Sequence, residues 1–230
     1  MKTATLQERR LARLEQPSYG VAEAARILDI PANTLRYWIR ATGARRAVIT
    51  PADPKNEILS FANLIEAYVL SALRREHEVS LQTIRKSVAY LRKQYPSRHP
   101  LADYDFATDG KHVFLERLSN IENLSKEGQI ELRKVIEAYL RNIKRDSSGI
   151  PIKLFPRARF EQTRPTREIV VNLDVAFGRP VLAHSGVRTE IIYQRWQAGE
   201  SPEELARDYE TSEQAIQEAL RYEARARNAA

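Results

Sequence analysis

The first quarter of the chain combines short apolar patterns at helical spacing with proline turns. Within residues 20–40 this pattern predicts two short helices around a turn, and the first helix ends before Pro31 because proline cannot continue it. Residues 44–60 contain two short apolar runs around Pro51-Ala52-Asp53-Pro54, which favours a β-hairpin. The charged residues 1–16 predict a short helix or a mobile arm.

Two longer amphipathic helices are expected next, each with one apolar face at 3-4 spacing. Their apolar positions are Phe61, Leu64, Ile65, Tyr68 and Ala72 in the first, and Leu81, Ile84, Val88, Leu91 and Tyr95 in the second. Ser80 is a suitable N-cap for the second helix. This spacing is compatible with helix packing inside the chain or with a dimer seam.

The rest of the chain mixes strand and helix patterns. The pattern predicts a strand at Lys111–Glu116, a helix at Lys126–Ile143, strands at Ile150–Phe155 and Glu168–Leu173, and three C-terminal helices. We therefore expect a mainly α fold with small β elements (α+β). The expected domains are a winged helix-turn-helix over residues 1–95, a mixed α/β middle region with a basic linker over 96–167, and a three-helix module over 168–230.

Composition narrows the class of protein. The 230 residues carry a net charge of +7, and such a basic chain favours a polyanionic partner, most often nucleic acid. Cysteine is absent, which fits a reducing compartment. The N-terminus is too polar for a signal peptide, and no apolar run reaches the roughly 18 residues of a membrane span. We expect a cytoplasmic protein.

The helix expected at Ala32–Arg40 has the composition of a major-groove reader. Asn and Arg side chains can pair with base edges, and Arg side chains at a hairpin can contact phosphates. The predicted DNA-binding residues are Asn33, Thr34, Arg36, Tyr37, Arg40, Arg45 and Arg46, whereas Leu35 and Trp38 are expected to point inward.

This segment resembles the MerR-like winged helix-turn-helix over about residues 18–75. The resemblance is carried by Val21-Ala22-Glu23-Ala24-Ala25, Ile30, Thr34-Leu35-Arg36-Tyr37 and Leu59-Ser60-Phe61. As a mechanism, we expect a homodimer that places two copies of the Ala32–Arg40 helix in successive major grooves of a palindromic operator in double-stranded DNA. The long effector-sensing coiled coil and the metal-binding cysteines of many MerR-like proteins are absent from this sequence.

The C-terminal module is acidic, with eight acids against two arginines over residues 197–224, which disfavours DNA as its partner. Ser201-Pro202-Glu203-Glu204 predicts a capping box at a helix start. Residues 174–224 resemble a small domain of VapB-like antitoxins that pair with PIN-type ribonuclease toxins. The matching residues are Gly178-Arg179-Pro180-Val181, Ser185-Gly186, Gly199, Ser201-Pro202-Glu203-Glu204-Leu205, Asp208-Tyr209, Ile216, Ala219-Leu220 and Tyr222.

That resemblance implies a type II antitoxin that neutralises its toxin and represses its own operon. Because PIN active sites are acidic, basic segments are the candidates for toxin binding, namely Arg157, Arg159, Arg164, Arg167, Arg225 and Arg227. The alternative is a one-component MerR-like transcriptional regulator without a toxin partner. The module could also serve in dimerisation.

Catalytic and metal sites are not expected. The four histidines, His77, His99, His112 and His184, lie far apart without ligand spacing, and no phosphate-binding glycine loop or nucleophile motif is present. We therefore expect no enzyme, no metal and no cofactor.

Overall fold

The computed structural model describes residues 5–41, 46–76, 79–103, 106–156 and 167–228. The N-terminal part consists of α1 (Leu6–Glu15), α2 (Val21–Leu28), α3 (Ala32–Ile39), α4 (Phe61–Glu76) and α5 (Leu81–Gln94). The middle region begins with a short π-helical turn, η1 (Phe106–Gly110), and continues with α6 (Lys111–Glu122) and α7 (Lys126–Leu140). After the sheet come α8 (Thr189–Gln197), α9 (Pro202–Asp208) and α10 (Glu213–Asn228).

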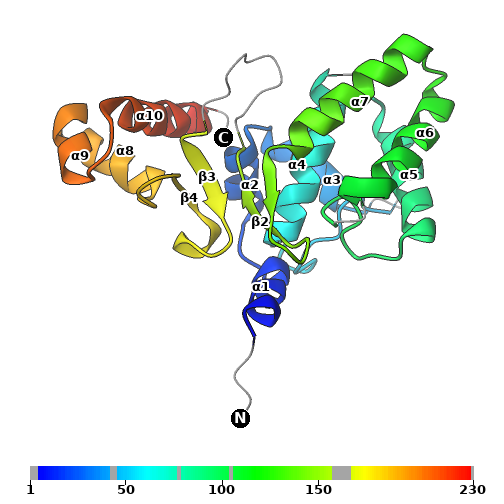
Figure 1. Ribbon diagram of the computed structural model, residues 1–230, viewed down its shortest axis with the longest axis horizontal. Coiled ribbons are helices and arrows are strands. Elements are labelled where there is room, and N and C mark those ends of the chain that lie inside the picture. The colour runs from blue at the N-terminus through cyan, green and yellow to red at the C-terminus, as the bar shows by residue number, and fades with distance from the viewer. Residues whose placement is uncertain (1–4, 42–45, 77–78, 104–105, 157–166, 229–230) are drawn as a thin grey trace.

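The helices form two groups on either side of a small sheet. Figure 1 shows α8, α9 and α10 at one end of the molecule and α5, α6 and α7 at the other, with α2, α4 and the strands between them. Helix α1 projects from the middle of the molecule (Figure 1). The predicted mainly helical α+β architecture with an N-terminal helix-turn-helix is confirmed.

The sheet joins the two groups of helices. It contains β1 (Ile143–Arg145), β2 (Pro151–Leu154), β3 (Ile169–Asn172) and β4 (Pro180–Leu182), all antiparallel and in sequence order. In the pairing of β3 with β4, Val170 lies opposite Val181. A short 3-10 turn, η2 (Ala176–Gly178), connects these two strands.

Buried side chains form two clusters that meet at the sheet. The larger cluster runs from Leu14 to Leu173, so the helix-turn-helix and the middle region share one continuous core. The smaller cluster contains Ile169 and Leu182 of the sheet together with residues of α8, α9 and α10, such as Ile192 and Ile216. The C-terminal module therefore has a core of its own.

Both apolar faces that could have formed a dimer seam are used within the chain. Residues Phe61–Leu73 of α4 are buried without interruption, and α7 packs against this helix. The face of α5 that contains Ile84, Val88 and Leu91 is buried, with α6 packed against α5. Ser80 caps α5 as predicted, since its hydroxyl accepts from the backbone N–H of Thr83 at 3.1 Å.

One predicted β element is wrong, and another is shorter than expected. Residues Lys111–Glu116 are the start of α6, because Phe114, Leu115 and Leu118 form a buried helical face whose packing overrides local strand propensity. In the described part of residues 44–60, the expected hairpin is reduced to a single bridge between Asp53 and Ile58. The prolines in this turn lack the N–H that a longer ladder requires.

Candidate nucleic-acid interface

Small and aliphatic residues of α2 let α3 pack closely against it. Ala24, Ala25 and Ile27 are buried, and Asp29 ends α2 in the left-handed conformation at a φ of 56°. Such a residue closes a helix because its backbone turns the chain away from the helix axis. Helix α3 then begins directly after Pro31.

The inner face of α3 anchors both the helix and the wing (residues 46–60). Leu35, Trp38 and Ile39 are buried, and Trp38 is only 1% exposed, so the inward placement of Leu35 and Trp38 is confirmed. The carbonyl of Trp38 accepts from the N–H groups of Val48 and Ile49 at 2.8 and 3.1 Å. The wing is thereby fixed directly beside the end of α3.

The outer face of α3 is open to solvent and carries the predicted reading residues. Asn33, Tyr37 and Arg40 are exposed, and Thr34 and Arg36 are half-buried. The Nη1 of Arg36 donates to Oδ1 of Asn33 at 3.0 Å, one helical turn apart. Arginine can pair with guanine edges and asparagine with adenine edges in the major groove, once their side chains turn to the base.

Arg40 is held by an acid from the wing. Its guanidinium donates twice to the carboxylate of Glu57, and one of these contacts, from Nη2 to Oε2, measures 3.0 Å. These hydrogen bonds raise the pKa of Arg40 and lower that of Glu57. The pair fixes the wing tip relative to α3, but it also places a negative charge at the edge of the candidate surface.

Helix α5 adds cations that sequence reasoning missed. The guanidinium of Arg85 lies 5.1 Å from the centre of the Tyr37 ring, in cation–π contact. Arg92, two turns further on the same face of α5, donates to the carbonyl of Val48 at 3.2 Å. The basic residues at i and i+7 were visible in the sequence, but only the fold shows that this face of α5 turns toward α3 and the wing.

A buried polar cluster on α4 forms hydrogen bonds with the backbone of the wing. The amide of Asn63 accepts from the N–H of Ala52 at 2.9 Å and donates to the carbonyl of Thr50 at 2.9 Å. Beside it, His99 lies between the carboxylates of Glu66 and Glu15, with its Nδ1 3.0 Å from Glu66 and its Nε2 2.9 Å from Glu15. Helices α1 and α4 thus share one hydrogen-bonded network with the wing.

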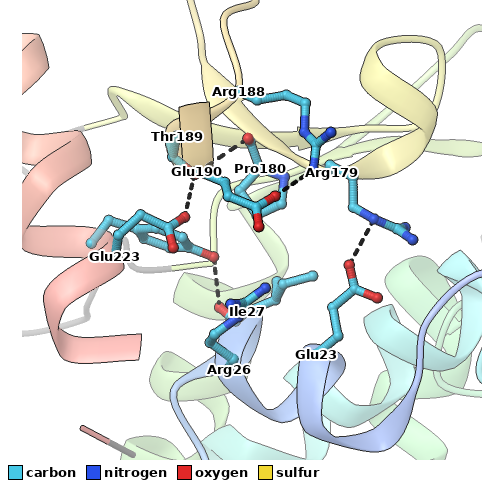
Figure 2. Close-up of a pocket in the computed structure, with 10 residues that line it drawn as sticks. Glu23, Arg26, Ile27, Arg179, Pro180, Arg188, Thr189, Glu190 and Glu223 are labelled. Carbon is cyan, nitrogen blue, oxygen red and sulfur yellow. Dashed lines mark hydrogen bonds and ion pairs between the residues drawn. The ribbon is translucent and has the colours of Figure 1, made fainter. Parts of the chain in front are cut away.

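The C-terminal module is joined to α2 by polar contacts. Figure 2 shows Arg179 paired with Glu23, at a distance of 2.7 Å. Across the same small pocket, the hydroxyl of Thr189 donates to Oε1 of the buried Glu223 at 2.6 Å (Figure 2). The Arg179–Glu23 pair joins the module to α2, whereas the Thr189–Glu223 hydrogen bond links α8 to α10 within the module.

The remaining predicted site residues are only partly described. Arg46 is exposed at the start of the wing, and Arg45 lies outside the described residues. Of the proposed toxin-binding residues, Arg167 and Arg225 are exposed, and Arg167 lies over the Phe155 ring at 5.4 Å. Those outside the described residues are Arg157, Arg159 and Arg164, together with the side chain of Arg227.

Within the described part of the chain, no cluster of three or more His, Cys, Asp or Glu residues is arranged to hold a metal ion. The same part contains no helix with the length and apolarity needed to cross a membrane.

Two family models match separate parts of the chain. Residues 17–88, from α2 into α5, match the model described as "Putative DNA-binding HTH domain". Residues 169–222, from β3 into α10, match the model described as "Protein of unknown function (DUF433)". The two matches cover the candidate interface and the C-terminal module.

Similarity to proteins of Mycobacterium tuberculosis extends over the whole fold. The chain is 25% identical to "Uncharacterized protein Rv2308", with 91% of each chain covered. The crystal structure of Rv2018 aligns at a TM-score of 0.69 and 28% identity, over 90% of this chain and 99% of that one. The protein named "Putative antitoxin VapB45" is 31% identical, over 90% of this chain and 94% of its own length. The chain therefore belongs to the family of the Mycobacterium tuberculosis protein VapB45.

Proposed function

We propose that this protein is the antitoxin of a type II toxin–antitoxin pair. It binds and neutralises a PIN-type ribonuclease and represses its own operon by binding operator DNA as a homodimer. The observation that carries the DNA-binding half is the exposed outer face of α3, where Asn33, Arg36, Tyr37 and Arg40 stand above a buried Leu35–Trp38 anchor. Membership of the VapB45 family supports the antitoxin half.

The charges around α3 match duplex DNA. Arg46 and Arg85 extend the basic surface from α3 onto the wing and α5, where they can contact phosphates on both sides of the reading helix. In the MerR-like arrangement that we propose, a homodimer places its two α3 helices in successive major grooves of a palindrome. The half-site centres would then lie roughly 10 bp apart, or a multiple of that distance.

The toxin contact is assigned to basic segments outside α3. The C-terminal module exposes Glu203, Glu204 and Asp208, and carboxylates would be repelled by the acidic centre of a PIN nuclease. Arg157, Arg159 and Arg164 between β2 and β3, with Arg167, provide a positive segment of the opposite sign. Neither the DNA-binding nor the toxin-binding role requires catalysis by this chain.

A gel-shift series on the chain's own promoter tests the DNA-binding proposal. Arg36→Ala and Asn33→Ala should each weaken specific binding by about 1–3 kcal/mol if the residue contacts a base. Arg207→Ala, on α9 of the acidic module, is the matched control and should bind like the wild type. Unchanged binding by both α3 variants would remove α3 from the reading role.

The reading frame beside the gene distinguishes the antitoxin from the one-component regulator. The antitoxin proposal expects it to encode a PIN-type nuclease, and co-expression of that nuclease with this chain tests protection. A chain with Arg157→Glu, Arg159→Glu and Arg164→Glu should lose protection and copurification. The control replaces Lys126, Arg133 and Lys134 of α7 with glutamate, which changes the net charge equally. Equal protection by both variants would refute the basic segment as the toxin contact. Failure of the wild type to protect would favour the regulator without a toxin.

A further inference from the structure

The turn between β3 and β4 holds an aromatic side chain out in solvent. Phe177 is 94% exposed, more than any other large hydrophobic side chain among the described residues. Its backbone and that of Ala176 are both left-handed, at φ values of 52° and 48°. Two successive non-glycine residues in this region carry backbone strain, and strained residues concentrate at functional and binding sites.

The turn is fixed on both sides, so the backbone at Phe177 is held in place. Before it, Asp174 accepts from Arg10 at 2.7 Å and from Arg13 at 3.3 Å, both on α1. After it, the carbonyl of Gly178 accepts from the hydroxyl of Tyr19 at 2.8 Å. A preorganised backbone loses little conformational entropy on binding, and an aromatic side chain on such a turn is suited to be an interface anchor.

A groove lies directly beside this side chain. It has a volume of about 510 Å³, which is within the range that protein pockets use, and Phe177 is part of its rim. Gln16, Pro17, Phe61 and Leu173 line its wall. None of its lining residues comes from α3. The groove therefore does not include any residue of the DNA-reading helix.

We propose that a second copy of this chain occupies the groove, with Phe177 of each copy inserted into the groove of the other. A two-fold interface uses the same patch on both copies, so it needs a projection and a cavity side by side on one surface. The Phe177 turn and its groove meet this requirement.

The charges on the rim are compatible with a second copy as the occupant. The rim carries Arg13 and Asp174, which form an ion pair within the chain, and Arg179, which is paired with Glu23. In a two-fold interface the Arg13–Asp174 pairs of the two copies can lie antiparallel, so that opposite charges face each other while each pair is kept. The apolar faces of α4 and α5 are buried inside the chain and offer no alternative seam.

Sedimentation of the full chain across the micromolar range tests the dimer without DNA, so its outcome is independent of operator binding. The wild type should sediment at twice its chain mass of 26.4 kDa. Phe177→Asn should raise the dimer dissociation constant by roughly 30-fold or more, because buried aromatic anchors dominate interfaces. Asparagine tolerates the left-handed backbone, so the turn is retained.

Ile130→Gln is the matched control, since it removes another exposed hydrophobic side chain, on α7. It should leave the dimer intact. The proposal would be overturned if both variants dissociated equally or if Phe177→Asn stayed dimeric. It would also be overturned if the wild type stayed monomeric across the whole micromolar range. A monomer whose Phe177→Asn variant loses binding to the co-expressed nuclease would assign the groove to that nuclease instead.

Disulfide trapping gives a second test that does not rely on loss of association. Because the chain has no cysteine, any disulfide must come from introduced residues. A mixture of Phe177→Cys and Gln16→Cys chains should form a cross-linked dimer on oxidation. Ile130→Cys mixed with Gln16→Cys should not. Equal yields from the two mixtures would contradict the proposed interface.

Discussion

The hydroxyl of Tyr19 donates to the carbonyl of Gly178 at 2.8 Å, across 159 positions of sequence, and so ties the start of the helix-turn-helix to the C-terminal module. A Cβ atom on Gly178 would lie 2.2 Å from this hydroxyl, and Gly178 has a φ of 72°. Glycine is therefore required both for space and for backbone conformation. Burial raises the pKa of Tyr19, which keeps the hydroxyl protonated as a donor.

Tyr19→Phe should destabilise the fold by about 1–3 kcal/mol, because it leaves the buried Gly178 carbonyl without its donor. Urea unfolding of the purified chain measures this loss. Tyr90→Phe, at an exposed position of α5, is the control and should change the midpoint little. Equal midpoints for Tyr19→Phe and the wild type would mean that the contact contributes no net stability.

Glu57→Gln should strengthen DNA binding. The Glu57 carboxylate pairs with Arg40 at the edge of the candidate interface and would repel phosphates. With that charge removed, Arg40 can contact phosphate, and the slope of log affinity against log salt should steepen by up to about one. Titrations at several salt concentrations measure the slope. Arg40 is 57% exposed, so the urea unfolding midpoint should change little. Weaker binding by this variant would show that the ion pair is needed to position Arg40.

Arg85→Ala should weaken binding to all duplexes similarly and reduce the salt slope by about one. Arg85 lies over Tyr37 beside the reading helix, where its charge can reach phosphates rather than bases. Arg85→Lys keeps the charge and should restore most of the slope. If Arg85→Ala instead changes sequence preference without changing the slope, the residue acts through the position of Tyr37.

Stability should fall as pH rises above about 6.5. Burial alone lowers the pKa of His99, but the hydrogen bond and charge of Glu66, followed by those of Glu15, outweigh it, so the pKa is raised above 6.5. The stabilisation from protonated His99 is complete below the unfolded-state value and is lost as pH rises through the folded-state value. Burial raises the pKa of Glu66 as well, which acts in the same direction.

Urea unfolding at a series of pH values from about 6 to about 9 measures this effect. His99→Gln retains hydrogen-bonding capacity without the titration, so its stability should vary less with pH than that of the wild type. Parallel pH profiles for the two proteins would show that another group is responsible.

Local sequence signals were sufficient where one side chain acts on its own neighbourhood. The box of Ser201 and Glu204 forms at the start of α9, with the Ser201 hydroxyl accepting at 3.2 Å from the backbone N–H of Glu204. The strand at Ile169–Asn172 and the inward-facing Trp38 were equally readable, because alternation and amphipathic spacing report burial directly. The sequence assigns Lys111–Glu116 wrongly because its apolar residues fit either a strand or a helix. The packing of α6 against α5, which favours the helix, depends on the tertiary structure.

The sequence by itself determined the helical periodicity, the turn at Pro31 and the outward set of Asn33, Tyr37 and Arg40, since these depend on residues within one or two turns of each other. Only the tertiary structure decided that Arg85 stacks on Tyr37, that Glu57 neutralises Arg40 and that Tyr19 fixes the Phe177 turn. Those contacts join residues 17 to 159 positions apart. Their geometry follows from how two hydrophobic cores close around the sheet, which no local pattern encodes.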